Sequence, residues 1–253
     1  MIKFRNCNLG EIKEIVCKYY VENDILVDSF WEEHALESMY YNIELDNEVI
    51  GFCGIYNKNL ITVFNVDKKY SYLAAEIFIK VRHLEEVSQV FVPTGDELLL
   101  SLSLDNFMSI EKQAYFTRDL KVKVNMDKSI NLKQASISDK DIIEKYSEDF
   151  FDDIDKSISL GCIYIARKDD EVLGFGNIEL GIIRSDLASL GMFVRKDFRE
   201  RGIGTNILFG LKEIVNMKGR EAISGCWYYN HNSLKTQFNS GNYCSTRLLR
   251  IKF

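Results

Sequence analysis

The residues best suited to chemistry lie in one glycine-containing loop, Arg195–Thr205, which reads RKDFRERGIGT. Gly202 and Gly204 let successive backbone N–H groups turn toward one point, because neither residue has a Cβ in the way. Arg199 and Arg201 add positive charge nearby. The helix predicted to follow the loop contributes unpaired N–H groups and the positive end of its dipole. Together these groups predict a binding site for a di-anionic phosphate group.

The elements on either side must hold this loop in place. Leu187–Val194 is predicted to be a strand, and Thr205–Met217 to be an amphipathic helix. The apolar stripe of that helix consists of Ile207, Leu208, Leu211, Ile214 and Val215. A G-x-G pair alone is weak evidence, because many plain turns contain one. A strand, a basic loop and an amphipathic helix in this order favour phosphate binding.

The rest of the second half predicts a mixed sheet flanked by helices. Further strands are expected at Ile130–Gln134, Cys162–Arg167, Val172–Glu179, Ala222–Cys226 and Tyr243–Phe253. Further helices are expected at Ser138–Tyr146, Asp149–Ser157 and Ser233–Asn239. The turn residues Lys168–Glu171 predict an antiparallel hairpin, which argues against a parallel nucleotide-binding fold.

Composition excludes several classes of protein. The chain has 253 residues, 46% hydrophobic and 28% charged, as expected for one large folded domain or two small ones. No apolar run approaches the roughly 18 residues that cross a bilayer. The charged N-terminus does not resemble a signal peptide, so we expect a cytoplasmic protein without a membrane partner. The net charge of −6 argues against nucleic acid as a partner.

Cysteine and histidine spacing gives no sign of a metal site. The six cysteines include no C-x-x-C pair, and the three histidines are far apart in the sequence. We expect the cysteines to be small apolar residues in a reducing compartment, and we expect no metal ion.

The chain repeats itself, which bears on its domain organisation. Phe116–Lys123 (FTRDLKVK) resembles Ser245–Lys252 (STRLLRIK) at an offset of 129 residues. Glu48–Phe52 (EVIGF) resembles Glu171–Phe175 (EVLGF) at an offset of 123. Both halves also open with an apolar strand followed by an isoleucine-rich helix. Three matches in the same order predict two similar domains, at residues 1–125 and 128–253.

Two motifs in the second half resemble those of a known family. The segment Val194-x-x-x-x-Arg199-x-x-Gly202-x-Gly204 resembles the acetyl-CoA-binding motif of the GCN5-related N-acetyltransferases (GNAT), written Q/R-x-x-G-x-G/A after a strand. Trp227–Ser233 and the later Gly241–Tyr243 are similar to the N-x-x-A/S and G-F/Y segments of that family. The resemblance implies an α+β fold class: two tandem GNAT-like domains, each a mixed, mostly antiparallel sheet flanked by helices.

The resemblance also implies roles for individual residues, with acetyl-CoA as co-substrate. Backbone groups of Met192, Phe193 and Val194 would pair with the pantetheine arm as an added strand does. The amides of Arg199, Glu200, Arg201, Gly202, Ile203, Gly204 and Thr205 would hold the pyrophosphate, and Asn230 and Ser233 would contact the arm near the thioester. The expected activity is N-acetyltransfer, in which an amine of a small molecule or peptide attacks the thioester directly in a ternary complex. A strand N–H, from Met192 or a neighbour, would polarise the carbonyl.

The chain departs from the family where protons are transferred. Many members have a tyrosine four residues after the A/S position, which protonates the departing thiolate, and here that position is Gln237. The alternatives for this role are Ser233, Tyr229, Tyr243 or a water, and the carboxylates considered as general base are Glu179 and Asp186. We take Ser233, Glu179 and Tyr229 as the catalytic candidates. The missing tyrosine leaves open a second class, a non-catalytic acyl-CoA sensor.

The N-terminal half lacks the phosphate loop. Aligning Val66 with Val194 places Asp67–Ala75, which contains no glycine, opposite the loop. We therefore expect a degenerate GNAT-like domain that binds no CoA and serves a structural role. A homodimer is kept open.

Overall fold

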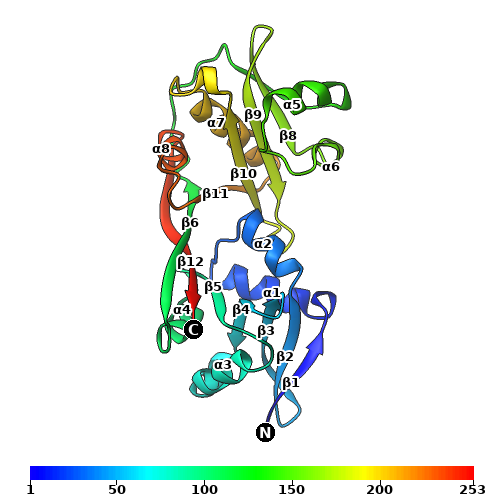
Figure 1. Cartoon of the computed structure of the whole chain (residues 1–253), viewed down its shortest axis with the longest axis vertical. Coiled ribbons are helices and arrows are strands. Elements are labelled where there is room, and N and C mark those ends of the chain that lie inside the picture. Colours follow the sequence, from blue (N-terminus) through cyan, green and yellow to red (C-terminus); the bar gives the residue numbers. More distant parts are fainter. The chain divides into compact units, whose positions relative to one another are not determined.

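The computed structural model describes all residues from Met1 to Phe253, and its elements follow the same order twice (Figure 1). The first half contains β1 (Ile2–Cys7), α1 (Leu9–Glu22), α2 (Ser29–Leu36), β2 (Met39–Leu45), β3 (Glu48–Tyr56), β4 (Leu60–Val66), α3 (Ala74–Arg82), β5 (Gln89–Pro93), α4 (Glu97–Leu104) and β6 (Ser109–Asp119). The second half contains β7 (Asn131–Gln134), α5 (Lys140–Tyr146), α6 (Ile154–Ser159), β8 (Ile163–Lys168), β9 (Glu171–Leu180), β10 (Leu187–Val194), α7 (Ile203–Met217), β11 (Glu221–Trp227), α8 (His231–Asn239) and β12 (Asn242–Lys252). The duplicated order confirms the predicted fold class.

By their internal contacts the residues form two units. The first unit comprises Met1–Tyr115, Ile182–Arg184 and Thr246–Phe253, and the second comprises Phe116–Gly181 and Ser185–Ser245. The predicted domains, 1–125 and 128–253, follow the sequence repeat. The two units differ from these ranges, because one strand of each half ends in the other unit. The end of β6 lies in the second unit and the end of β12 lies in the first.

Each unit has a sheet in which most neighbouring strands are antiparallel. In the first unit the order is β1-β2-β3-β4-β5 followed by the end of β12, and in the second it is β7-β8-β9-β10-β11 followed by the end of β6. In the second unit α7 packs on one face of the sheet through its predicted apolar stripe. The helices α5 and α6 cover the other face. Among the strands β7 to β11, β10 and β11 form the one parallel pair, and the other neighbouring strands are antiparallel.

The repeated EVxGF segment has the same structural role in both units. It opens β3 and β9, and in each the pairing with the preceding strand shifts register at this point. Gly51 and Gly174 then approach the next strand so closely that a Cβ would lie 2.2 Å from a backbone oxygen, that of Asn65 or of Phe193. Any side chain would therefore push the strands apart, which explains why glycine stands at both positions.

Several boundaries differ from those predicted. The helix predicted at Asp149–Ser157 is instead α6, which begins at Ile154 because the side chain of Asp153 accepts a hydrogen bond from the N–H of Lys156. For the same reason α8 begins at His231 rather than Ser233, since Asn230 is its N-cap. The predicted hairpin of β8 and β9 is confirmed, with Asp169 at φ +53° in its turn.

A short segment of the β9–β10 connection is held inside the first unit. The carboxylate of Glu32 in α2 accepts hydrogen bonds from the N–H groups of Ile182 and Ile183, the shortest at 2.7 Å. The buried guanidinium of Arg184 donates to the carbonyl oxygens of Tyr20 and Ile25. Burial raises the pKa of Glu32 although these amide hydrogen bonds favour the charged carboxylate.

Candidate functional site

The predicted phosphate loop lines a cleft of about 840 Å³ in the second unit. The N-terminus of α7, the end of β10 and one side of α8 form its walls. Every residue predicted to bind the coenzyme lines this cleft except Arg201. The structure adds six lining residues that the sequence did not single out: Phe150, Phe198, Asn232, Lys235, Thr236 and Asn239.

The edge of β10 is open where it lines the cleft. The parallel pairing of β10 with β11 covers only Leu187–Ser189, opposite Glu221–Ile223. Beyond Ser189 the strand β10 continues to Val194 without a partner on that side, while β9 pairs with its other side up to Val194. The backbone groups of Met192–Val194 are thus available to an extended ligand, as at a sheet edge.

The loop after β10 presents a run of free backbone donors. None of the amides from Glu200 to Thr205 donates a hydrogen bond to another protein group, and the first amide of α7 to do so is that of Asn206. Gly202 has φ +75° and Glu200 has φ +64°, so the chain turns here through left-handed conformations. Such a turn before a helix N-terminus forms a concave group of N–H donors suited to an anion.

The two glycines of the loop have different roles. Gly202 needs its left-handed φ, and a Cβ there would meet no atom within 4 Å. Gly204 lacks a left-handed φ, but its Cβ would lie 2.9 Å from Cγ2 of Thr236 and 3.1 Å from Sδ of Met192. Gly204 therefore lets α7 pack closely on α8 and β10, a role that the spacing of the glycines did not reveal.

Arg199 orders the loop through its side chain. Its Nε donates a hydrogen bond of 3.0 Å to the backbone oxygen of Val194, and its guanidinium lies 5.6 Å from the ring centre of Phe193. The sequence suggested that Arg199 supplies charge to a phosphate. In the structure it ties the loop back to the end of β10, and so fixes the amides that follow.

The N-x-x-S segment is a helix cap. The side-chain oxygen of Asn230 accepts a hydrogen bond of 3.0 Å from the N–H of Ser233. This contact fixes the first turn of α8, which lines the cleft. Asn230 and Ser233 thus line the same cleft as the loop residues.

The three catalytic candidates do not gather at one point. Ser233 lines the cleft, whereas Glu179 and Tyr229 do not. Glu179 is exposed on β9 opposite Ser189, and its charge adds to burial in raising the pKa of Cys162. Tyr229 is 54% exposed and packs edge-on against Trp227, with ring centres 5.0 Å apart.

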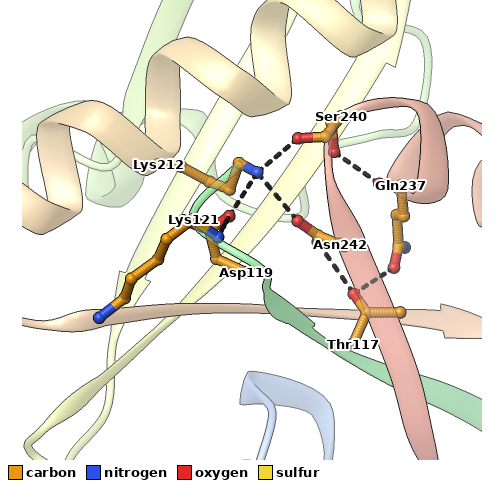
Figure 2. A network of polar contacts seen from close by, with 7 residues as sticks. All are labelled: Thr117, Asp119, Lys121, Lys212, Gln237, Ser240 and Asn242. Atoms are coloured by element: carbon orange, nitrogen blue, oxygen red, sulfur yellow. Dashed lines mark hydrogen bonds and ion pairs between the residues drawn. The ribbon is translucent and has the colours of Figure 1, made fainter. Parts of the chain in front are cut away.

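Gln237, at the position of the family's tyrosine, faces the protein interior. It is 2% exposed, and its side-chain oxygen accepts a hydrogen bond of 2.6 Å from the hydroxyl of Thr117 in β6 (Figure 2). The side chain is therefore part of the packing between α8 and β6, and it does not line the cleft.

Phe150 is a cleft residue that sequence reasoning missed. Its ring packs against Phe193 at 5.6 Å and Phe151 at 4.8 Å between centres. A Cβ on Gly191 would lie 3.3 Å from Cζ of Phe150, so the ring sits directly over β10. The available signal was an aromatic pair between acidic residues, in a segment assigned to a helix.

The corresponding loop of the first unit has a different conformation. Lys68–Leu73 forms a 3-10 helix, which is longer than the one at Lys196–Phe198 in the second unit, and none of its residues has a positive φ. Lys69 is paired with Glu48 at 2.6 Å, a contact that raises the pKa of the lysine. The concave run of amides seen after β10 is therefore not repeated in this unit.

Two further observations concern metal ions and membranes. Nowhere do three His, Cys, Asp or Glu side chains come together in a way that could hold a metal ion. No helix is both long enough and apolar enough to cross a membrane.

Both halves of the chain match family models. Residues 8–120 match one described as Acetyltransferase (GNAT) domain, and residues 130–235 match one described as Acetyltransferase (GNAT) family. The chain therefore belongs to the GNAT family and carries two such domains in tandem. This membership supports acyltransferase activity in general. A search of curated protein sequences found no significant match.

Solved structures share the fold of the whole chain. An acetyltransferase of the GNAT family from Colwellia psychrerythraea is 17% identical, with a TM-score of 0.88 over 99% of both chains. A GCN5-related N-acetyltransferase from Sphaerobacter thermophilus is 13% identical, with a TM-score of 0.64 over 100% of this chain and 95% of its own. A tandem GNAT protein from the clavulanic acid biosynthesis pathway is 10% identical, with a TM-score of 0.58 over 100% and 98%. At these identities the likeness concerns the fold alone.

Proposed function

We propose that the protein is an N-acetyltransferase that transfers the acetyl group of acetyl-CoA to a primary amine of a small molecule or peptide. The observation that carries the proposal is the run of unpaired amides from Glu200 to Thr205 beside the open edge of β10. A pyrophosphate needs a concave group of donors, and a pantetheine arm needs free strand-like backbone groups. The cleft offers both within about 840 Å³, so the residues present fit the coenzyme.

The positions of these backbone groups in the cleft suggest which part of acetyl-CoA each of them binds. Amides of Glu200–Thr205 hold the pyrophosphate, and backbone groups of Met192 and Phe193 pair with the pantetheine arm. Acetyl-CoA, when bound, supplies an acetyl group already activated as a thioester. An N–H of β10 near Met192 donates to the carbonyl oxygen of that group, where negative charge develops during the reaction. Holding both reactants together removes much of the entropic barrier to direct attack by the amine.

Proton transfer requires one group beside the departing sulfur and another that takes a proton from the amine. Ser233 is the one catalytic candidate that lines the cleft, so we assign it contact with the departing sulfur. Glu179 and Tyr229 lie outside the lining residues and would act through water. The acceptor is the amine class that the family implies. The proposed location is the cytoplasm.

The proposal is tested by binding and turnover together. Calorimetry with acetyl-CoA should show one site per chain, assigned to the second unit. Adding a panel of primary amines should then release free thiol, followed with a thiol-reactive dye. Absence of acetyl-CoA binding at millimolar concentration would refute the proposal at its first step.

Burial of Gln237 favours a second candidate function, a non-catalytic acyl-CoA sensor. With this side chain occupied by Thr117, no tyrosine hydroxyl stands at the position that protonates the thiolate in many family members. A sensor would bind acetyl-CoA with the same affinity but release no thiol with any amine of the panel. Thiol release above the rate without enzyme would exclude the sensor.

A further inference from the structure

Two similar strand ends occupy two similar positions in this protein. The β6 end (Phe116–Asp119, FTRD) lies in the second unit, and the β12 end (Ser245–Leu248 in the repeat, STRL) enters the first unit from Thr246. Threonine and arginine occur at the same places in both segments. The last residue of each differs in charge: Asp119 in β6 and Leu248 in β12.

Asp119 meets a buried lysine in the second unit. Nζ of Lys212 in α7 lies 2.8 Å from Oδ1 of Asp119, and the two side chains are 3% and 6% exposed. The same ammonium group donates to the side-chain oxygen of Asn242 and to the backbone oxygen of Ser240 (Figure 2). All three N–H donors of the lysine are thus used inside the protein.

Leu248 meets an apolar environment in the first unit. It is fully buried and pairs with Pro93 of β5. The buried positions of α7 at Gly204, Ile207, Leu208 and Leu211 match those of α3 at Ala74, Ile77, Phe78 and Val81. This match places Arg82 where the second unit has Lys212. Arg82 stacks on the ring of Phe253, with its guanidinium carbon 3.9 Å from the ring centre.

We propose that Lys212 and Asp119 form a strand-sorting pair, which directs β6 rather than β12 to the second unit. With the β12 end in that position, Leu248 would face Lys212 and leave a buried ammonium without its carboxylate. With the β6 end in the first unit, Asp119 would be buried beside β5 in place of a leucine. The first placement buries the ammonium of Lys212 without a partner, which is costly in a protein interior. The second places Asp119 near Arg82, which is less buried than Lys212, so the cost falls mainly on Lys212.

The pair therefore favours the arrangement with the β6 end in the second unit over the one with the β12 end there, in addition to any effect on the free energy of unfolding. A buried ion pair contributes little net stability compared with well-packed apolar residues, but the loss of one partner is strongly unfavourable. The shared threonine and arginine cannot discriminate between the two positions, because they are the same in both strands. Two differences can: Asp119 against Leu248, and the buried Phe116 against the exposed Ser245.

The test measures where the β12 end lies after refolding. Gln89 and Lys252 are direct partners between β5 and β12, so Gln89→Cys with Lys252→Cys can form a disulfide only when β12 lies in the first unit. After unfolding, refolding and mild oxidation, the linked peptide is quantified by mass spectrometry, and a non-reducing gel separates links within a chain from links between chains. In the otherwise native protein we expect nearly complete linkage within the chain.

The double variant Asp119→Leu/Lys212→Met removes the pair without leaving a charge. It should refold, because apolar residues of similar size commonly replace a buried ion pair. Its linkage within the chain should fall below that of the otherwise native protein, because only Phe116 and Ser245 then distinguish the two strand ends. The variant Asp119→Leu/Leu248→Asp moves the carboxylate to β12 and should lower the linkage further.

Thr117→Val is the matched control. It removes a buried hydroxyl of the same network (Figure 2), but threonine occurs in both strands and so carries no sorting information. It should lower stability and leave the linkage complete. Complete linkage in Asp119→Leu/Lys212→Met would overturn the inference. Failure of that variant to refold would also overturn it, because the pair would then be required by the fold itself.

Discussion

Gly202→Val tests whether the loop backbone holds the coenzyme, and Gly219→Val is its matched control. Gly202 has φ +75° and Gly219, just after the end of α7, has φ +72°. A Cβ at either position would meet no protein atom within 4 Å. The two substitutions therefore impose the same backbone strain without a steric clash, and only the first lies in the cleft.

The strain should affect the stability of both variants equally. Holding a non-glycine residue in the left-handed region costs about 1–2 kcal/mol. For a chain of this size, a loss of that order lowers Tm by roughly 2–8 °C. Thermal unfolding of the two variants, measured side by side without ligand, should therefore shift by similar amounts.

Only Gly202→Val should weaken acetyl-CoA binding. The branched side chain stands among the donor amides and turns one or two of them away from the pyrophosphate. A hydrogen bond to a charged group contributes about 1.5–3 kcal/mol, so the dissociation constant should rise roughly tenfold to several hundredfold.

The assay is calorimetric titration with acetyl-CoA at a temperature where both variants are folded. Gly219→Val should bind as the native protein does. If Gly202→Val kept its dissociation constant within about twofold of the native value while losing as much stability as Gly219→Val, the amides of this loop would not be the pyrophosphate site.

Three further predictions address packing and charge. Burial raises the pKa of Asp96 to about 6, so its stabilising contribution is complete below pH 3.8 and is lost as the pH rises through 6. Asp96→Asn keeps an N-cap for α4 and should raise the unfolding free energy by up to about 3 kcal/mol at pH 8, with little effect near pH 4 in urea titrations. Glu32→Ala leaves the N–H groups of Ile182 and Ile183 without an acceptor, so the free energy of unfolding should fall by about 2–4 kcal/mol in urea titrations. An unchanged urea midpoint would contradict the assigned contacts. Gly204→Ala should separate α7 from α8 and lower Tm by several degrees in thermal unfolding, and an unchanged Tm would contradict the close packing at this position.

The sequence predicted the order of elements well, because local signals define each of them. The turn residues Lys168–Glu171 indicated the β8–β9 hairpin, and the apolar stripe indicated α7. The loop Arg195–Thr205 was found for the same reason, since its glycines and the following helix are close in sequence. Boundaries were less accurate where a cap decides them, as with Asp153 before α6.

Contacts between distant segments could not be predicted. Nothing near Gln237 in the sequence indicates that it bonds to Thr117, which is 120 residues away. Phe150 enters the cleft only because its loop folds over Gly191. The exchange of the β6 and β12 ends was not predicted, because the repeat that revealed the duplication aligns the two segments with each other and gives no reason to separate them.

The exchanged β12 end has a consequence for synthesis of the protein. Residues 246–253 complete the sheet of the first unit, although they are synthesised after the whole of the second unit. The first unit therefore keeps one edge of β5 uncovered until these residues have been made. Nascent chains halted before residue 246 should expose this edge to chaperones, whereas the β6 end is already available when the second unit emerges.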